Sequence, residues 1–85
     1  MQTRVAVISI IVEEQDSVPV LNALLSEYGE WIIGRMGIPY RERGVNVITV
    51  ALDAPQDTVS ALAGKLGALP GVSAKAAYSS AIFEG

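Results

Sequence analysis

The sequence predicts an α+β domain in which two helices cover one face of a four-stranded antiparallel sheet. Four segments rich in β-branched and small apolar residues alternate with two segments of helical periodicity, in the order β-α-β-β-α-β. Each helical segment joins two strands, and such crossovers are right-handed in nearly all sheets. The order and this rule lead to the ferredoxin-like split βαβ sandwich, with residues 1–80 as one domain and residues 81–85 as a C-terminal tail.

The strands expected at Arg4–Val12 and Val45–Leu52 are apolar on both faces, which is typical of central strands. One set of alternating residues comprises Ala6, Ile8, Ile10, Val12, Ile48, Val50 and Leu52. The other set comprises Val5, Val7, Ile11, Val45, Val47 and Ala51. Because the helices can cover only one face of the sheet, we expect whichever set they leave uncovered to contact a second subunit.

The first helix is expected to follow the polar turn at residues 13–16. Asp16 or Ser17 is the expected N-cap, Pro19 is tolerated in the first turn, and Gly29 is the expected stop. The apolar stripe of this helix consists of Val18, Leu21, Leu24, Leu25 and Tyr28.

The second strand is expected at residues 31–40 and is interrupted by Gly34 and Gly37, which indicate a bulge or a close backbone approach. Pro39 lacks an N–H group and therefore suits an edge strand. Gly44 can supply the positive φ of the hairpin that leads into the third strand.

The second helix is expected to begin at Asp53, a plausible N-cap, and to end near Gly67. Its inward stripe consists of Val59, Leu62, Ala63 and Leu66. The last strand is expected at Val72–Ser79, and the tail that follows could dock through Phe83.

The composition limits the functions open to this chain. It has 85 residues with neither Cys nor His, so it has no disulfide or thiolate site, and it lacks the commonest metal ligand and proton shuttle. A domain this small usually needs extra stabilisation, and self-association remains available. The net charge of −3 argues against direct nucleic-acid binding, and no apolar run is long enough to span a membrane. We therefore expect a cytoplasmic homo-oligomer, without a cofactor or a bound metal.

Three arginines lie in or beside the second hairpin, which is half of the six Lys and Arg residues. They could hold a carboxylate or phosphate through charge-assisted hydrogen bonds, or they could be a solvated hairpin pairing with Glu42 or Glu84. The residues predicted to bind a ligand are Gly34, Arg35, Gly37, Arg41 and Arg43. The residues predicted to form an oligomer interface are Ile8, Ile10, Val12, Ile48 and Val50.

Other candidate sites have simpler interpretations. The acidic residues at 13–16 could bind a hard cation, but they suit the N-terminus of the first helix better. Trp31 and Tyr40 could stack on a planar ligand, or they could pack in the core or an interface. No nucleophile–base pair is visible, so the sequence favours a protein that is not an enzyme.

Three segments together resemble a known family: residues 35–42 (RMGIPYRE), residues 62–67 (LAGKLG) and residues 70–75 (PGVSAK). They are similar to the iron-only hydrogenase system regulators. The resemblance implies an ACT-like version of the ferredoxin fold, similar to the C-terminal domain of the nickel-responsive repressor and often tetrameric. This chain lacks the His and Cys residues that sense nickel in that repressor, and also its DNA-binding arm.

The resemblance favours a regulatory module that binds a small anionic or amino-acid-like ligand as a homodimer or homotetramer. The alternative is a protein-interaction or scaffold module without a small-molecule ligand. A small ferredoxin-fold enzyme is a third reading, but it would need a convergent polar group that the sequence does not show.

Overall fold

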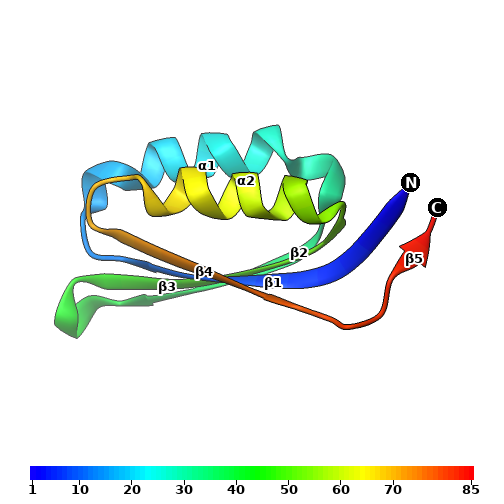
Figure 1. The fold of residues 1–85 in the computed structure, drawn as a ribbon. Helices are drawn as coiled ribbons and strands as arrows, with labels where there is room; N and C mark the ends of the chain where they lie inside the picture. The colour runs from blue at the N-terminus through cyan, green and yellow to red at the C-terminus, as the bar shows by residue number, and fades with distance from the viewer.

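The computed structural model describes all 85 residues, which form two layers (Figure 1). The strands are β1 (Gln2–Val12), β2 (Ile32–Tyr40), β3 (Val45–Ala54), β4 (Val72–Tyr78) and β5 (Phe83–Glu84). The helices are α1 (Val18–Glu27) and α2 (Gln56–Gly67), and short 3₁₀ helices occupy Gln15–Ser17, Gly29–Trp31 and Arg41–Arg43. Both α-helices lie on the same side of the sheet, and Figure 1 shows no element covering its other side. Neither helix has the length and apolarity needed to cross a membrane.

The main sheet has the order β2-β3-β1-β4, and all neighbouring strands are antiparallel. β1 and β3 are therefore central, as their apolar residues on both faces predicted. The predicted edge position of β2 is also confirmed, and a register shift between Ile32 and Gly34 marks the expected bulge. The tail at residues 81–85 contains β5, in which Phe83 pairs with Thr3 of β1 while its side chain stays 48% exposed.

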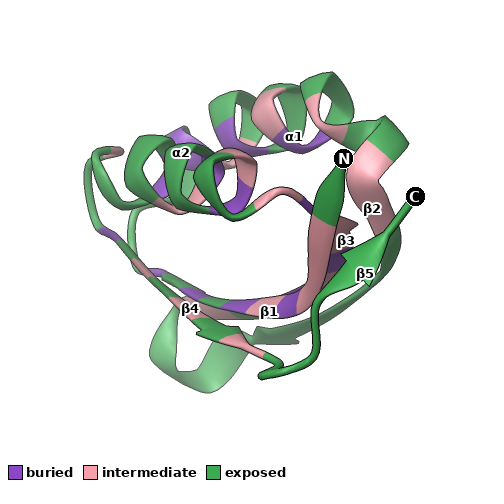
Figure 2. Cartoon of the chain, turned by 45° about the vertical axis from the view of Figure 1, so that its right-hand side comes forward, coloured by how far each residue is buried: buried purple, intermediate pink, exposed green.

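The core lies between the sheet and the two helices, as the buried stripes in Figure 2 show. Each element contributes its alternating or helical set of apolar residues, and together they form one cluster. The buried members are Ala6, Ile8, Ile10, Val12, Leu21, Leu25, Ile48, Val50, Leu52, Ala54, Val59, Leu62, Leu66 and Val72. The face of β1 and β3 that begins with Ala6 is thus the one that the helices cover.

The predicted N-cap position is confirmed for α1 and wrong for α2. Ser17 is the N-cap residue of α1, but its side chain makes no capping bond and its Oγ donates instead to the carbonyl oxygen of Pro70 at 2.7 Å. Asp53 belongs to β3, and Pro55 occupies the N-cap position of α2. The strand continues beyond Leu52 because Asp53 and Ala54 still pair with Val5 and Arg4 of β1.

The loop after β1 and the loop before β4 are held together at one end of the molecule. Besides the bond from Ser17, the Glu13 N–H donates to the carbonyl oxygen of Gly71 at 2.7 Å. Gly71 has a φ of 67°, and a Cβ atom there would lie 2.6 Å from the Cβ of Glu14. Only glycine fits this position, because both the backbone conformation and the close approach exclude a side chain.

Candidate functional site

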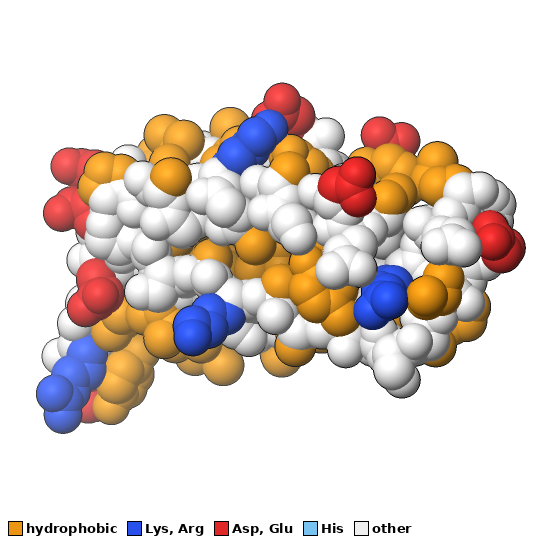
Figure 3. Space-filling model, viewed as in Figure 1, with side chains coloured by type: hydrophobic (Ala, Val, Ile, Leu, Met, Phe, Trp, Pro, Cys, Tyr) orange, Lys and Arg blue, Asp and Glu red, His pale blue; other side chains and the backbone are white.

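The face of the sheet opposite the helices is open and largely apolar. We call this surface the open face. Its residues, assigned from the strand pairing, are Val5, Val7, Ser9, Ile11, Gly34, Met36, Ile38, Tyr40, Val45, Val47, Thr49, Ala51, Ser73, Lys75 and Ala77. The most exposed large apolar side chains are Met36 (63%), Ile38 (56%), Tyr40 (47%), Ile11 (45%) and Val47 (40%). Apolar side chains also appear along the lower margin of the molecule in Figure 3, beneath the sheet.

The strand register places these apolar side chains in one continuous patch. Ile38 pairs with Val47, and Val47 pairs with Ile11, so three neighbouring strands present one row. The next row is more polar, with Thr49 and Ser9 between Met36 on one edge strand and Lys75 on the other. An exposed apolar patch with polar residues toward its edge is typical of an interaction surface.

The five residues predicted to form the oligomer interface lie on the other side of the sheet. Ile8, Ile10, Val12 and Val50 are 0% exposed and Ile48 is 6% exposed, and all five belong to the core beneath the helices. Their assignment to an interface is wrong, because a partner could reach them only if the helices left the sheet. The open face carries the other alternating set, which includes Val5, Ile11 and Val47.

A groove of about 250 Å³ lies between α1 and the edge strand β2, on the helix side of the sheet. Arg35 pairs with the buried Val50 and Gly37 pairs with the buried Ile48, so both occupy positions where an apolar core residue would be expected. The core layer is therefore incomplete at this edge. The groove is lined by Val18 and Asn22 of α1, by residues 35 and 37–39 of β2, and by Asn46 and Ile48 of β3.

Arg35 has no acidic partner in this groove. One Nη atom donates to the side-chain oxygen of Asn22 at 3.2 Å. The one ion pair of the chain joins the N-terminal amine to Glu84 at 3.9 Å, at the far end of the molecule. The positive charge of Arg35 is thus held against α1 by a neutral amide and remains unpaired.

Asn46 lines the groove on the side of the hairpin and bonds to Gln15 outside it. Asn46 Nδ2 donates to Gln15 Oε1 at 3.3 Å, and Gln15 Nε2 donates to the carbonyl oxygen of Gly44 at 3.5 Å. These contacts join β3, the loop before α1 and the hairpin. Arg35 and Gly37 were predicted from the sequence, whereas Asn22 and Asn46 were not, because their convergence depends on tertiary packing.

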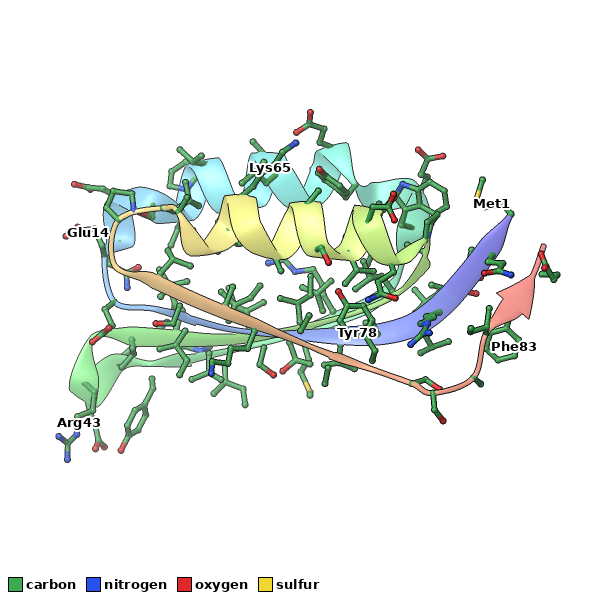
Figure 4. All side chains as sticks on the ribbon, viewed as in Figure 1. Met1, Glu14, Arg43, Lys65, Tyr78 and Phe83 are labelled. Atoms are coloured by element: carbon green, nitrogen blue, oxygen red, sulfur yellow. The ribbon has the colours of Figure 1, made fainter.

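The other predicted ligand-binding residues lie elsewhere. Gly34 belongs to the open face, where it pairs with Ala51. Arg41 and Arg43 belong to the short helix of the hairpin, and Figure 4 shows Arg43 at the projecting tip. Arg41 lines a separate hollow of about 310 Å³ together with Tyr40 and Gln15. Neither hairpin arginine forms an ion pair with Glu42 or Glu84.

The titratable groups do not form a catalytic or metal-binding cluster. No group of three or more Asp or Glu side chains converges, including the acidic residues at 13–16. Tyr28 raises the pKa of the Lys65 ammonium, which lies 5.1 Å from the centroid of its ring on the outer side of the helix layer. Asp53 Oδ1 is buried without a hydrogen-bond partner, but Asp53 stands alone at the end of β3. Trp31 packs partly against the core, whereas Tyr40 lies on the open face.

Comparison with known proteins agrees with this fold. A family described as "TM1266-like: Iron-only hydrogenase system regulator, putative" matches residues 4–76. The solved structure of the uncharacterized protein TM1266 from Thermotoga maritima is 34% identical, with a TM-score of 0.86. That match covers 89% of this chain and 96% of the other. The chain belongs to the TM1266-like family. The family resemblance predicted from the three sequence segments is therefore confirmed.

A second solved structure supports the fold alone. A formyltetrahydrofolate deformylase from Pseudomonas putida KT2440 matches with 16% identity and a TM-score of 0.61. The match covers 86% of this chain and 28% of the deformylase chain. No curated protein matches the chain.

Proposed function

We propose that this TM1266-like protein is a non-enzymatic regulatory module of an iron-only hydrogenase system. In this proposal it works as a homodimer or homotetramer and responds to a small anionic ligand. The family description supports the regulatory role. The observation that carries the assembly is the open face, which leaves five large apolar side chains between 40% and 63% exposed.

The size of the open face suits contact with a second copy. The chain extends 42 × 19 × 17 Å, so the footprint of its sheet side is at most roughly 700–800 Å². A standard protein–protein interface buries about 800 Å² on each partner. Covering each half-exposed apolar side chain contributes roughly 1 kcal/mol, since full burial contributes about twice as much.

The arrangement of the open face also suits a two-fold contact. In such a contact both subunits use the same surface, so the row of Ile38, Val47 and Ile11 would meet the equivalent apolar surface of its partner. Lys75 lies on the edge strand β4, where its ammonium can remain at the solvated rim.

The absence of His and Cys from the sequence supports a non-enzymatic role. A general base or nucleophile would have to come from Asp, Glu, Lys, Tyr, Ser or Thr, and such groups need a base or a perturbed pKa to act. Tyr28 raises the pKa of Lys65, whereas a nucleophilic amine needs a lowered pKa.

Light scattering after size exclusion tests the assembly. We expect the wild-type protein to have the mass of a dimer or tetramer at micromolar concentration. Ile38→Glu should give a monomer, because it places a charge in the apolar row at its β2 end. Val20→Glu is the matched control, because Val20 is 51% exposed on α1 and away from the open face. A monomeric wild type, or an Ile38→Glu protein of unchanged mass, would contradict the proposal.

The alternative is a protein-interaction module without a small ligand. The projecting hairpin favours it, because exposed Arg41 and Arg43 lie beside Tyr40 at the end of the open face. Under this alternative, a stoichiometric partner should co-purify with the wild type and be lost with the Arg43→Gln variant. Retention of that partner by Arg43→Gln would exclude the hairpin as its contact.

A further inference from the structure

The groove between α1 and β2 is rich in hydrogen-bond donors. A guanidinium group has five N–H donors, and Arg35 uses one Nη atom in its bond to Asn22. Asn22 accepts that bond through Oδ1, and its own Nδ2 group makes no bond within the chain. Asn46 uses its Nδ2 group toward Gln15 and also lines the groove. The local chemistry therefore favours a ligand that accepts hydrogen bonds and carries negative charge.

The bottom of the groove is apolar. Ile48 is 6% exposed beneath Gly37, and Val18 of α1 lies across from it. A Cβ atom at Gly37 would lie 4.0 Å from the Cγ1 atom of Ile48, which is an ordinary contact, and Gly37 has no positive φ. Neither strain nor a close approach requires glycine there, so a side chain would fit at position 37 and fill the space. The missing side chain is what keeps the groove open.

We infer that this groove binds a small carboxylate, whose charged end pairs with Arg35 and whose short apolar body lies over Ile48. The planar guanidinium fork matches the two oxygens of a carboxylate. This inference specifies the ligand class of the proposed function. A regulatory role for the bound carboxylate rests on the proposed function, whereas the geometry of the groove does not depend on it.

The volume of the groove suits a small ligand. The groove holds about 250 Å³, whereas drug-sized ligands occupy sites of roughly 300–1,000 Å³. The apolar bottom favours a carboxylate with a short alkyl chain over inorganic phosphate, which would leave Ile48 and Val18 in contact with polar oxygens. Arg43 lacks this combination, because it projects from the tip of the molecule (Figure 4).

The test is a titration of the full chain with sodium butyrate at constant ionic strength, followed by two-dimensional ¹H–¹⁵N NMR. Butyramide serves as the neutral analogue of the same shape, and inorganic phosphate as the anion without an apolar body. The variants are Arg35→Gln, which removes the charge, and Gly37→Val, which fills the groove with a residue that favours strands. Arg43→Gln is the matched control, because it removes an arginine outside the groove.

We expect butyrate to shift the backbone amides of Arg35 and Gly37 and the side-chain amide of Asn22. Its affinity should exceed that of butyramide and of phosphate. Arg35→Gln should weaken binding about tenfold or more, because it removes a charge-assisted contact. Gly37→Val should abolish binding, Arg43→Gln should leave it unchanged, and the spectrum of each variant shows whether it is folded.

Three results would overturn the inference. Wild-type affinity in Arg35→Gln would exclude the guanidinium, and phosphate binding as tight as that of butyrate would exclude the carboxylate class. Shifts confined to the hairpin, together with a loss of binding in Arg43→Gln, would move the site there. Light scattering on the same samples separates this inference from the proposed assembly, because Arg35 and Gly37 lie on the helix side of the sheet. Butyrate binding to a monomeric protein would support the groove and contradict the assembly.

Discussion

Substitution of Gly71 by Ala should destabilise this protein much more than the same substitution at Gly44. Both glycines have a left-handed backbone, with φ of 67° and 65° respectively. A Cβ atom at Gly44 would meet nothing within 4 Å, whereas one at Gly71 would lie 2.6 Å from the Cβ and 3.0 Å from the backbone N of Glu14. The pair therefore separates the cost of the backbone conformation from the cost of the close approach.

The left-handed conformation costs an L-residue about 1–2 kcal/mol, and this cost applies at both positions. At Gly71 the two loops must also move apart, which endangers two hydrogen bonds of 2.7 Å. These bonds run from Glu13 N to the Gly71 carbonyl oxygen and from Ser17 Oγ to the Pro70 carbonyl oxygen. Each contributes about 1 kcal/mol. We therefore expect Gly71→Ala to cost roughly 3–4 kcal/mol and Gly44→Ala about 1–2 kcal/mol.

Thermal unfolding followed by far-ultraviolet circular dichroism measures this difference. For a domain of this size, 1 kcal/mol lowers Tm by about 4–8 °C, so Gly71→Ala should melt at least about 12 °C below the wild type. The protein concentrations must be equal, because self-association raises Tm. Equal losses in the two variants would refute the argument, because they would show that the loops accommodate a methyl group at no cost.

Two further predictions concern the core and the helix surface. Ile8→Ala should lower the free energy of unfolding by about 2–5 kcal/mol, because Ile8 is fully buried. Ile11→Ala, at a residue 45% exposed, should cost less than about 1 kcal/mol in the monomer and weaken self-association instead. Urea unfolding measures the loss of stability in each variant, and light scattering measures the loss of self-association. A larger loss of stability in Ile11→Ala than in Ile8→Ala would contradict the assigned faces. Tyr28→Phe should lower the pKa of Lys65 toward its ordinary value of 10.5. The raised pKa of Lys65 stabilises the fold below pH 10.5, and this contribution is lost as pH rises through the raised value. An NMR titration that gives the same Lys65 pKa in Tyr28→Phe as in the wild type would contradict the role of the Tyr28 hydroxyl.

The fold could be predicted because the strands and helices differ clearly in period. The strand pattern of β1 and β3 placed them at the centre of the sheet, and Pro39 placed β2 at an edge. The errors occurred where a short polar residue had two possible partners. Ser17 and Asp53 both resemble capping residues, but the Ser17 side chain bonds to Pro70 and Asp53 continues the ladder opposite Val5.

The assignment of the two sheet faces could not be made from periodicity, because alternation separates the two sets without showing which one the helices cover. A weak indication was present in the sequence. Ser9 and Thr49 fall in the set that includes Ile11, whereas the corresponding positions of the other set are Ile or Val. Polar residues are the ones expected away from the core, and both lie on the open face.

The groove could be predicted only in part. Arg35 and Gly37 were identifiable because a charged residue and a glycine interrupt an otherwise apolar strand. Asn22 falls outside the apolar stripe of the first helix, so the helical period places it away from the core. Its contact with Arg35 depends on how α1 lies across the edge of the sheet, which the helical period does not determine.

The edge strand β2 belongs to both proposed sites, because alternate residues of a strand face opposite sides of the sheet. Arg35 and Gly37 line the groove, while Met36 lies between them on the open face. Ile38 belongs to the open face by its pairing with Val47 and also borders the groove. A ligand held by Arg35 and a subunit packed on Ile38 would therefore restrain the same stretch of backbone from two sides. Any change that the ligand makes in the affinity between subunits must appear as an equal change that assembly makes in the affinity for the ligand. An edge strand can couple the sites in this way because it is paired on one side alone, whereas β1 and β3 are fixed by neighbours on both sides.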